Sequence, residues 1–218
     1  MRLRGLYAIA DPAVIGAADF SAAVEAALAG GAVAVQYRDK LARADERAQR
    51  ARDVVQACHR AGALAIINDT PSLAASVGAD GVHLGADDPE PEAVREQLGT
   101  GAIVGVSCYD QLARAQAAQA AGADYIAFGR MFPSATKPGG PHPDAELLGR
   151  ARAQTGLAVC AIGGITVERA PALVRAGADL LAVCGDLFAR EDIAAQARAY
   201  ASIFGPMDPP HGTGSTAS

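Results

Sequence analysis

The feature that most constrains the fold is a joint that recurs along the chain. At each joint a helical stretch rich in small residues ends at glycine, and a short apolar run follows at once. Glycine fits the left-handed conformation that closes a helix, and a continuous apolar run is typical of a strand buried on both faces. Such repeats predict βα units and a parallel sheet covered by helices. The joints are Ala61-Gly62-Ala63, Gly78-Ala79-Asp80, Gly122-Ala123-Asp124 and Gly177-Ala178-Asp179.

The apolar runs predict eight strands, near residues 5–10, 32–37, 63–68, 80–85, 102–107, 124–129, 157–162 and 179–184. Amphipathic spacing predicts helices between them, as over 44–61 and 110–121, and a short one over 70–77. Ser21, and Thr166 with Glu168, are typical helix starts. Eight alternating units favour an α/β fold, a (β/α)8 TIM barrel of one domain over 1–204. A doubly wound sheet of this length usually has about five or six strands.

Composition excludes several classes of function. The chain of 218 residues is 50% hydrophobic and 20% charged, and no apolar run approaches the roughly 20 residues that span a bilayer. Its start lacks a secretory signal, so we expect a soluble, cytoplasmic protein. A net charge of −5 gives no basic surface for nucleic acid or an anionic membrane. The four scattered cysteines are expected to be buried thiols, and residues 205–218, rich in Gly, Pro, Ser and Thr, a disordered tail.

Polar side chains follow the second predicted strand. Gln36, Arg38 and Lys40 alternate with their neighbours, so in a strand they share one direction. Two cations and an amide that converge at the mouth of a barrel suit a phosphate or diphosphate. An ordinary polar strand end with surface ion pairs is the alternative.

Carboxylates follow the third and fourth predicted strands. Asp69 and the Asp87-Asp88 pair lie at adjacent strand ends, where they can jointly hold Mg²⁺, which prefers oxygen ligands and often bridges phosphates. Alternatively, Asp69 caps the next helix, and the pair is the acidic start of another. His83 can face the core, hydrogen-bonded rather than catalytic.

The remaining strands end in hydroxyls and glycines. Ser107 closes the fifth strand, either at the mouth or as a helix cap. The long loop over 129–140 carries two hydroxyls and a cation, which indicates a binding loop or lid. Glycine-rich turns at Gly163-Gly164 and Gly185 stand where many barrels bind a monophosphate through backbone N–H groups. The whole set suits an enzyme that joins or cleaves two phosphorylated small molecules.

These motifs resemble the thiamine phosphate synthase family over roughly residues 5–190. The resemblance is carried by Leu6-Tyr7-Ala8-Ile9-Ala10-Asp11, Gln36-Tyr37-Arg38-Asp39-Lys40, Asn68-Asp69, Gly81-Val82-His83-Leu84-Gly85, Gly105-Val106-Ser107, the loop from Phe128 to Lys137 and Ala161-Ile162-Gly163-Gly164-Ile165. It implies a transferase that condenses an aminopyrimidine methyl diphosphate with thiazole phosphate to give thiamine phosphate and diphosphate. It also implies a dissociative reaction in which diphosphate leaves first.

The resemblance also implies roles for individual residues. It makes Asp69 and Asp88 the ligands of Mg²⁺, and it gives catalytic roles to Arg38, Lys40, Ser107 and Lys137. Contacts to the pyrimidine diphosphate fall to Gln36, Tyr37, Arg38, Asp39, Lys40, Asn68, Ser107 and Lys137, and contacts to the thiazole phosphate to Ser134, Ala135, Thr136, Gly164, Cys184 and Gly185. The expected partners are small phosphorylated substrates, without nucleic acid or membrane, and a homo-oligomer is compatible with the sequence.

The sequence departs from the family pattern in three places: at Thr70, at Ala86 and at the Gly185-Asp186 pair. Asp186 puts a carboxylate near the expected phosphate site, and we expect it to turn away, towards Arg190 four residues on. The alternatives are a thiazole tautomerase of the same branch, which does not need the diphosphate contacts, and a non-catalytic thiamine-pathway binding or regulatory protein. A sugar-phosphate isomerase would share only the glycine turns.

Overall fold

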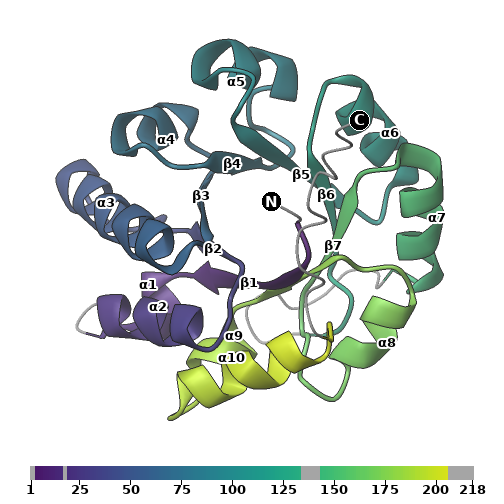
Figure 1. Ribbon diagram of the computed structural model, residues 1–218. Coiled ribbons are helices and arrows are strands. Elements are labelled where there is room, and N and C mark those ends of the chain that lie inside the picture. The colour runs from purple at the N-terminus through teal and green to yellow at the C-terminus, as the bar shows by residue number, and fades with distance from the viewer. Residues whose placement is uncertain (1–2, 17–18, 134–142, 206–218) are drawn as a thin grey trace, which may run out of the picture.

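The computed structural model describes residues 3–16, 19–133 and 143–205, and there eight parallel strands close into a barrel in sequence order (Figure 1). Each strand pairs with the next, and β1 pairs with β8. The strands are β1 Gly5–Ala10, β2 Ala34–Tyr37, β3 Leu64–Asn68, β4 Gly81–Leu84, β5 Ile103–Tyr109, β6 Tyr125–Phe128, β7 Ala158–Ile162 and β8 Leu180–Val183. The predicted (β/α)8 barrel is confirmed.

Helices form a ring outside the barrel (Figure 1). They are α1 Pro12–Ile15, α2 Phe20–Ala29, α3 Ala44–Ala61, α4 Pro71–Val77, α5 Pro91–Leu98, α6 Leu112–Ala120, α7 Glu146–Thr155, α8 Ala170–Arg175, α9 Gly185–Phe188 and α10 Ile193–Ser202. Within the described residues, none is both long and apolar enough to cross a bilayer.

Three helices test the sequence predictions closely. The long α3 has the bounds that its periodicity predicts, and the short α4 begins at Pro71. The predicted start of α8 at Thr166 is wrong. There the carbonyl of Thr166 accepts N–H groups of Arg169 and Ala170 in a separate turn, and α8 begins only at Ala170, where proline occupies the first turn.

Side chains alternate between the two faces of the barrel wall. Outward-facing residues pack against the helices in the larger core. A smaller inner core fills the barrel with Tyr7, Ile9, Ala34, Leu64, Ile66, Tyr125, Ala127, Cys160, Leu180 and Ala182. Burial of each large aliphatic side chain contributes about 1.5–3 kcal/mol. Because Ala34 faces inward, the alternation also turns Gln36 inward, one layer nearer the carboxyl-terminal end.

The amino-terminal end of the barrel is tied by three reciprocal pairs of hydrogen bonds, which we call the aspartate clips. Each clip comes from the aspartate of a Gly-Ala-Asp joint. Its carboxylate accepts an N–H from an earlier strand, and its own N–H returns to the carbonyl of the same residue. The pairs are Asp80 with Ala65, Asp124 with Val104 and Asp179 with Val159, at 2.7–3.1 Å. The joint predicted from sequence is thus also a clamp between strands.

Each clip carries a basic side chain on its carboxylate. His59 lies 3.1 Å from Asp80, Arg95 2.6 Å from Asp124 and Arg152 2.5 Å from Asp179.

The four cysteines are free thiols, three of them buried and Cys184 half-buried. The domain boundary after 204 stays a prediction, and residues 206–218 of the expected tail lie outside the described residues.

Candidate active site

Several of the predicted polar residues lie at the carboxyl-terminal end of the barrel, which we call the mouth. Arg38 follows β2, and its guanidinium pairs with Asp11, which follows β1. The other oxygen of the Asp11 carboxylate accepts the Ala13 N–H at 2.9 Å, at the start of α1. Asp11 therefore fixes the position of Arg38. Sequence reasoning missed this role, which needs knowledge that β1 and β2 are neighbours.

Lys40, which also follows β2, contacts the residues after β3, whereas Arg38 contacts those after β1. Its ammonium lies 3.2 Å from the carboxylate of Asp69, which follows β3. Asp69 has a left-handed backbone, with φ of 58°, and its N–H donates to the carbonyl of His83 at 2.9 Å. A non-glycine residue in this conformation is uncommon. Thr70, not Asp69, occupies the cap position of α4, so the capping alternative for Asp69 is wrong.

Asp88 is the second carboxylate of this group. It accepts the Gly85 N–H at 2.6 Å, while the cap position of α5 belongs to Glu90. Burial raises the pKa of Asp88, and the hydrogen-bonding neighbour Asp69 raises it as well. Two carboxylates close enough to disfavour each other's charge are a ready place for a cation.

These residues fit Mg²⁺. The described part of the chain holds no group of three or more His, Cys, Asp or Glu side chains that could bind a metal. Mg²⁺, however, keeps several waters and is usually held by one or two carboxylates together with substrate phosphates. The Asp69–Asp88 pair beside Lys40 meets that description.

Two predicted contact residues face the helices instead of the mouth. The ring of Tyr37 packs on Phe20 in the outer core. The carboxylate of Asp39 accepts bonds from the Tyr37 hydroxyl at 3.1 Å and from Arg50 at 2.9 Å. Although burial opposes it, bonds from backbone N–H groups and Arg50 lower the pKa of Asp39. Their assignment as substrate contacts stays a prediction.

A chain of five hydrogen-bonded side chains crosses the floor of the mouth. Gln36 donates its Nε2–H to Tyr7 at 2.8 Å, and the hydroxyls of Tyr7 and Tyr125 lie 2.9 Å apart. His83 lies 2.9 Å from Tyr125 through Nδ1 and 2.9 Å from Ser107 through Nε2. Burial lowers the pKa of His83 to about 4, so its ring is neutral at pH 7. We call this set the floor chain.

The floor chain settles two sequence-based alternatives. His83 faces the interior and is hydrogen-bonded, as expected. Ser107 lies within β5, which continues to Tyr109, and the cap position of α6 belongs to Gln111. The predicted strand end at 107 is therefore two residues short, and the capping alternative for Ser107 is wrong. Asn68, the last residue of β3, pairs in register with His83 beside the chain.

The glycine turns stand on the side of the mouth formed by β7 and β8. Gly164 has φ of 63°, and a Cβ there would lie 2.5 Å from the carbonyl oxygen of Pro133. Glycine is therefore required at this position. Cys184 and Gly185 form the start of the short helix α9, and the space around Gly185 is open. Ser134, Ala135, Thr136 and Lys137 lie outside the described residues, so their predicted contacts stay predictions.

Asp186 turns away from these glycines, as expected. Its carboxylate pairs with Arg190 at 2.5 Å and accepts bonds from Gln196 and from the Tyr200 hydroxyl, each at 2.7 Å. Although burial opposes it, the bonds from Tyr200 and Arg190 hold the pKa of Asp186 below its usual range. A carboxylate satisfied in this way does not face a ligand at Gly185.

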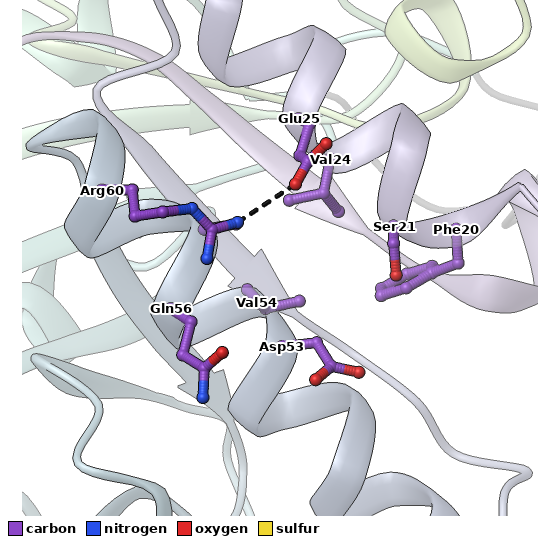
Figure 2. A pocket seen from close by; sticks show the side chains of 9 residues that line it. Phe20, Ser21, Val24, Glu25, Asp53, Val54, Gln56 and Arg60 are labelled. Carbon is purple, nitrogen blue, oxygen red and sulfur yellow. Dashed lines mark hydrogen bonds and ion pairs between the residues drawn. The ribbon is translucent and has the colours of Figure 1, made fainter.

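A hollow of about 220 Å³ lies elsewhere, between α2 and α3 on the outside of the barrel (Figure 2). Phe20 and Val24 line one side of it, and an ion pair between Arg60 and Glu25, 3.1 Å long, spans it. Its residues all come from these two helices, so it is separate from the mouth.

Fold and mouth together define a (β/α)8 barrel with cations, paired carboxylates and glycine turns at one end, a set that suits small phosphorylated molecules. A family model described as thiamine monophosphate synthase matches residues 6–187. The chain belongs to this family, which confirms the resemblance seen in the sequence.

Individual proteins agree with the family match. The thiamine-phosphate synthase of Azoarcus sp. (strain BH72) is 51% identical over 93% of this chain and 98% of its own. That of Nitrosococcus oceani is 50% identical over 93% of both chains. Among solved structures, thiamine phosphate pyrophosphorylase from Pyrococcus furiosus has a TM-score of 0.82 and 31% identity, covering 93% of this chain and 96% of that one.

Proposed function

We propose that the protein is a transferase that joins 4-amino-2-methyl-5-(diphosphooxymethyl)pyrimidine to thiazole phosphate, giving thiamine phosphate and diphosphate. The family match over residues 6–187 supports this reaction. The observation that carries it is the meeting of Arg38, Lys40, Asp69 and Asp88 at one mouth. A monophosphate isomerase needs no such set, because it releases no diphosphate.

The reaction breaks the bond between the pyrimidine methylene carbon and the diphosphate oxygen, which leaves with the electron pair. The thiazole nitrogen then forms the new bond to that carbon. Arg38 and Lys40 hold the departing diphosphate and stabilise its growing charge, and Lys137 is proposed to join them. Asp11 keeps the Arg38 guanidinium in place. The thiazole phosphate, held at the glycine turns, would present its nitrogen in line for attack, and no side-chain base is needed.

Mg²⁺ is the cofactor that we propose for Asp69 and Asp88. When bound, the ion would supply positive charge to the leaving diphosphate. It would also neutralise the two neighbouring carboxylates, which otherwise disfavour each other. Lys40 lies 3.2 Å from Asp69, beside this pair.

We assign the thiazole phosphate to Gly164, Cys184 and Gly185. Gly185 has no hydroxyl, so binding there relies on backbone N–H groups. The outward turn of Asp186 supports the assignment, because a carboxylate in the pocket would repel a phosphate dianion.

The test is to mix the purified protein with both substrates and Mg²⁺ and to assay thiamine phosphate and diphosphate. Equal amounts of the two products are expected. Isomerised thiazole phosphate without joining would favour the tautomerase alternative, and binding without turnover would favour a regulatory protein. Cytoplasmic location and self-association stay predictions.

The metal assignment has its own test. Asp69→Asn and Asp88→Asn should each raise the Mg²⁺ concentration for half-maximal activity about tenfold or more, since each removes one anionic ligand. Asp53→Asn, on α3, is the matched control and should keep the dependence of the parent. Equal Mg²⁺ dependence in all four proteins would overturn the metal assignment.

A further inference from the structure

The floor chain has a feature that the proposed reaction does not use. Its three central members, Tyr7, Tyr125 and His83, are buried, and the two tyrosines are each 1% exposed. Burying a polar group costs about 1–3 kcal/mol unless it is hydrogen-bonded, and barrel interiors are usually filled by branched apolar side chains. In this barrel, three buried polar side chains instead connect Gln36 with Ser107.

The rings of the chain are held rigidly. Tyr125 packs edge-on against Tyr7 and stacks on His83, with ring centroids 5.9 and 5.6 Å apart. Its ring also occupies the space over Gly105, where a Cβ would lie 1.9 Å from the Cζ atom of Tyr125. The hydroxyl of Tyr125 is therefore fixed between its two partners.

A chain of this kind has one direction of donation. Each tyrosine hydroxyl, and a neutral histidine, has a single proton to give. Because Gln36 donates to Tyr7, Tyr7 donates to Tyr125, and Tyr125 donates to Nδ1 of His83. His83 then donates its Nε2–H to Ser107. This leaves the Ser107 proton and the Gln36 carbonyl oxygen for a ligand.

We propose that Tyr7, Tyr125 and His83 are positioning residues that fix the donor at Ser107 and the acceptor at Gln36, and so select an aminopyrimidine over an oxopyrimidine. The inference rests on the proposed function for its pyrimidine substrate. An aminopyrimidine offers amino N–H groups to Gln36 and a ring nitrogen to Ser107. A 4-oxopyrimidine carries a carbonyl in place of the amino group. Its oxygen would then face the carbonyl oxygen of Gln36, and neither can donate a hydrogen bond. A site built on hydrogen bonds strongly rejects such a mismatch.

The test measures binding of the 4-amino and 4-oxo pyrimidine methyl diphosphates by calorimetry, with Mg²⁺ and without the thiazole. The parent should bind the amino compound about 100-fold or more tightly than the oxo compound. Tyr125→Phe breaks the chain and should lower this ratio at least tenfold. Tyr7→Phe breaks it one link earlier and should do the same, which keeps the test valid if Tyr125→Phe fails to fold.

Tyr200→Phe is the matched control. Tyr200 is also buried and hydrogen-bonded through its hydroxyl, but to Asp186 outside the floor chain. This variant should lose stability and keep the ratio of the parent, since a general loss of packing does not distinguish two pyrimidines.

The outcomes separate the two proposals. If the parent forms thiamine phosphate but Tyr125→Phe and Tyr7→Phe keep its amino-over-oxo ratio, the positioning role is overturned and the proposed function stands. If the parent neither binds the amino compound nor forms thiamine phosphate, the proposed function falls and the inference falls with it. An equal fall of the ratio in Tyr200→Phe would reduce the effect to packing and also overturn the inference.

Discussion

The two ends of the barrel use the same residue type in opposite ways. At the amino-terminal end, Asp80, Asp124 and Asp179 each carry a basic partner and two backbone hydrogen bonds. At the carboxyl-terminal end, Asp69 and Asp88 are neighbours of like charge. Hydrogen bonds to a charged group contribute about 1.5–3 kcal/mol each, whereas like charges oppose folding. Carboxylates with a basic partner and backbone bonds thus tie the strands at one end, while the like-charged pair at the other end lies where we propose that Mg²⁺ and the diphosphate bind.

The largest expected effect is a loss of kcat on replacing Arg38 at the mouth, compared with Arg95 at the amino-terminal end. Arg38→Ala should lower kcat by about 10²–10³, because one cation at a leaving group is worth as much as a lost oxyanion donor. Arg95→Ala removes the partner of Asp124 instead, so it should lower the free energy of unfolding and leave kcat within about twofold. Steady-state kinetics and urea unfolding of both variants check this. Comparable kcat values in the two variants would contradict the difference in role between the two ends of the barrel.

A smaller effect is expected from His83 as the pH falls. Its pKa is about 4 in the folded protein, below the unperturbed value of about 6.5. Between pH 6.5 and 4, His83 is therefore protonated in the unfolded chain and neutral in the folded chain. The stability that His83 contributes is complete above pH 6.5 and falls by about 3 kcal/mol as the pH drops to 4.

His83→Gln removes this titration. The difference in unfolding free energy between parent and His83→Gln should therefore shrink towards acid over pH 6.5 to 4, as urea unfolding across the range would show. A constant difference would mean that the imidazole titrates normally and is not held neutral in the floor chain.

The smallest expected effect concerns Asp186. Because its carboxylate is engaged by Arg190, Gln196 and Tyr200, Asp186→Ala should leave the KM for thiazole phosphate nearly unchanged while lowering stability. Gly185→Ser should be tolerated or lower that KM. If Asp186→Ala lowers this KM tenfold or more, about 1.4 kcal/mol, the carboxylate faces the ligand and the second substrate differs from thiazole phosphate.

The fold could be predicted because its signals are local. A glycine joint followed by an apolar run specifies a helix end and a strand within a few residues, and eight such runs imply closure. The common direction of Gln36, Arg38 and Lys40 follows from the same local alternation. The start of α8 was predicted too early because a capping pattern at Thr166 formed a separate turn.

The rest depends on contacts between distant residues. Tyr7 and Tyr125 are 118 positions apart and meet only because the barrel closes. The pairing of Arg38 with Asp11 requires the neighbouring ends of β1 and β2. The left-handed backbone of Asp69 could not be read from the sequence, because aspartate adopts this conformation only occasionally. Predicted contacts at residues 134–137 lie outside the described residues.

We propose that the amino-terminal end holds the barrel together and the carboxyl-terminal end carries the chemistry. Asp124→Asn and Asp88→Asn test it most directly, because one substitution is made at each end. Unfolding free energy is measured in urea with chelator, and kcat is measured at the Mg²⁺ concentration that is half-maximal for the parent.

Asp124→Asn should lose about 1–3 kcal/mol of stability and keep its kcat. Asp88→Asn should keep or gain stability, since it relieves Asp69 of a like charge, and should lose most of its activity. Loss of stability at Asp88 with full activity, or loss of activity at Asp124 with full stability, would contradict the division between the two ends.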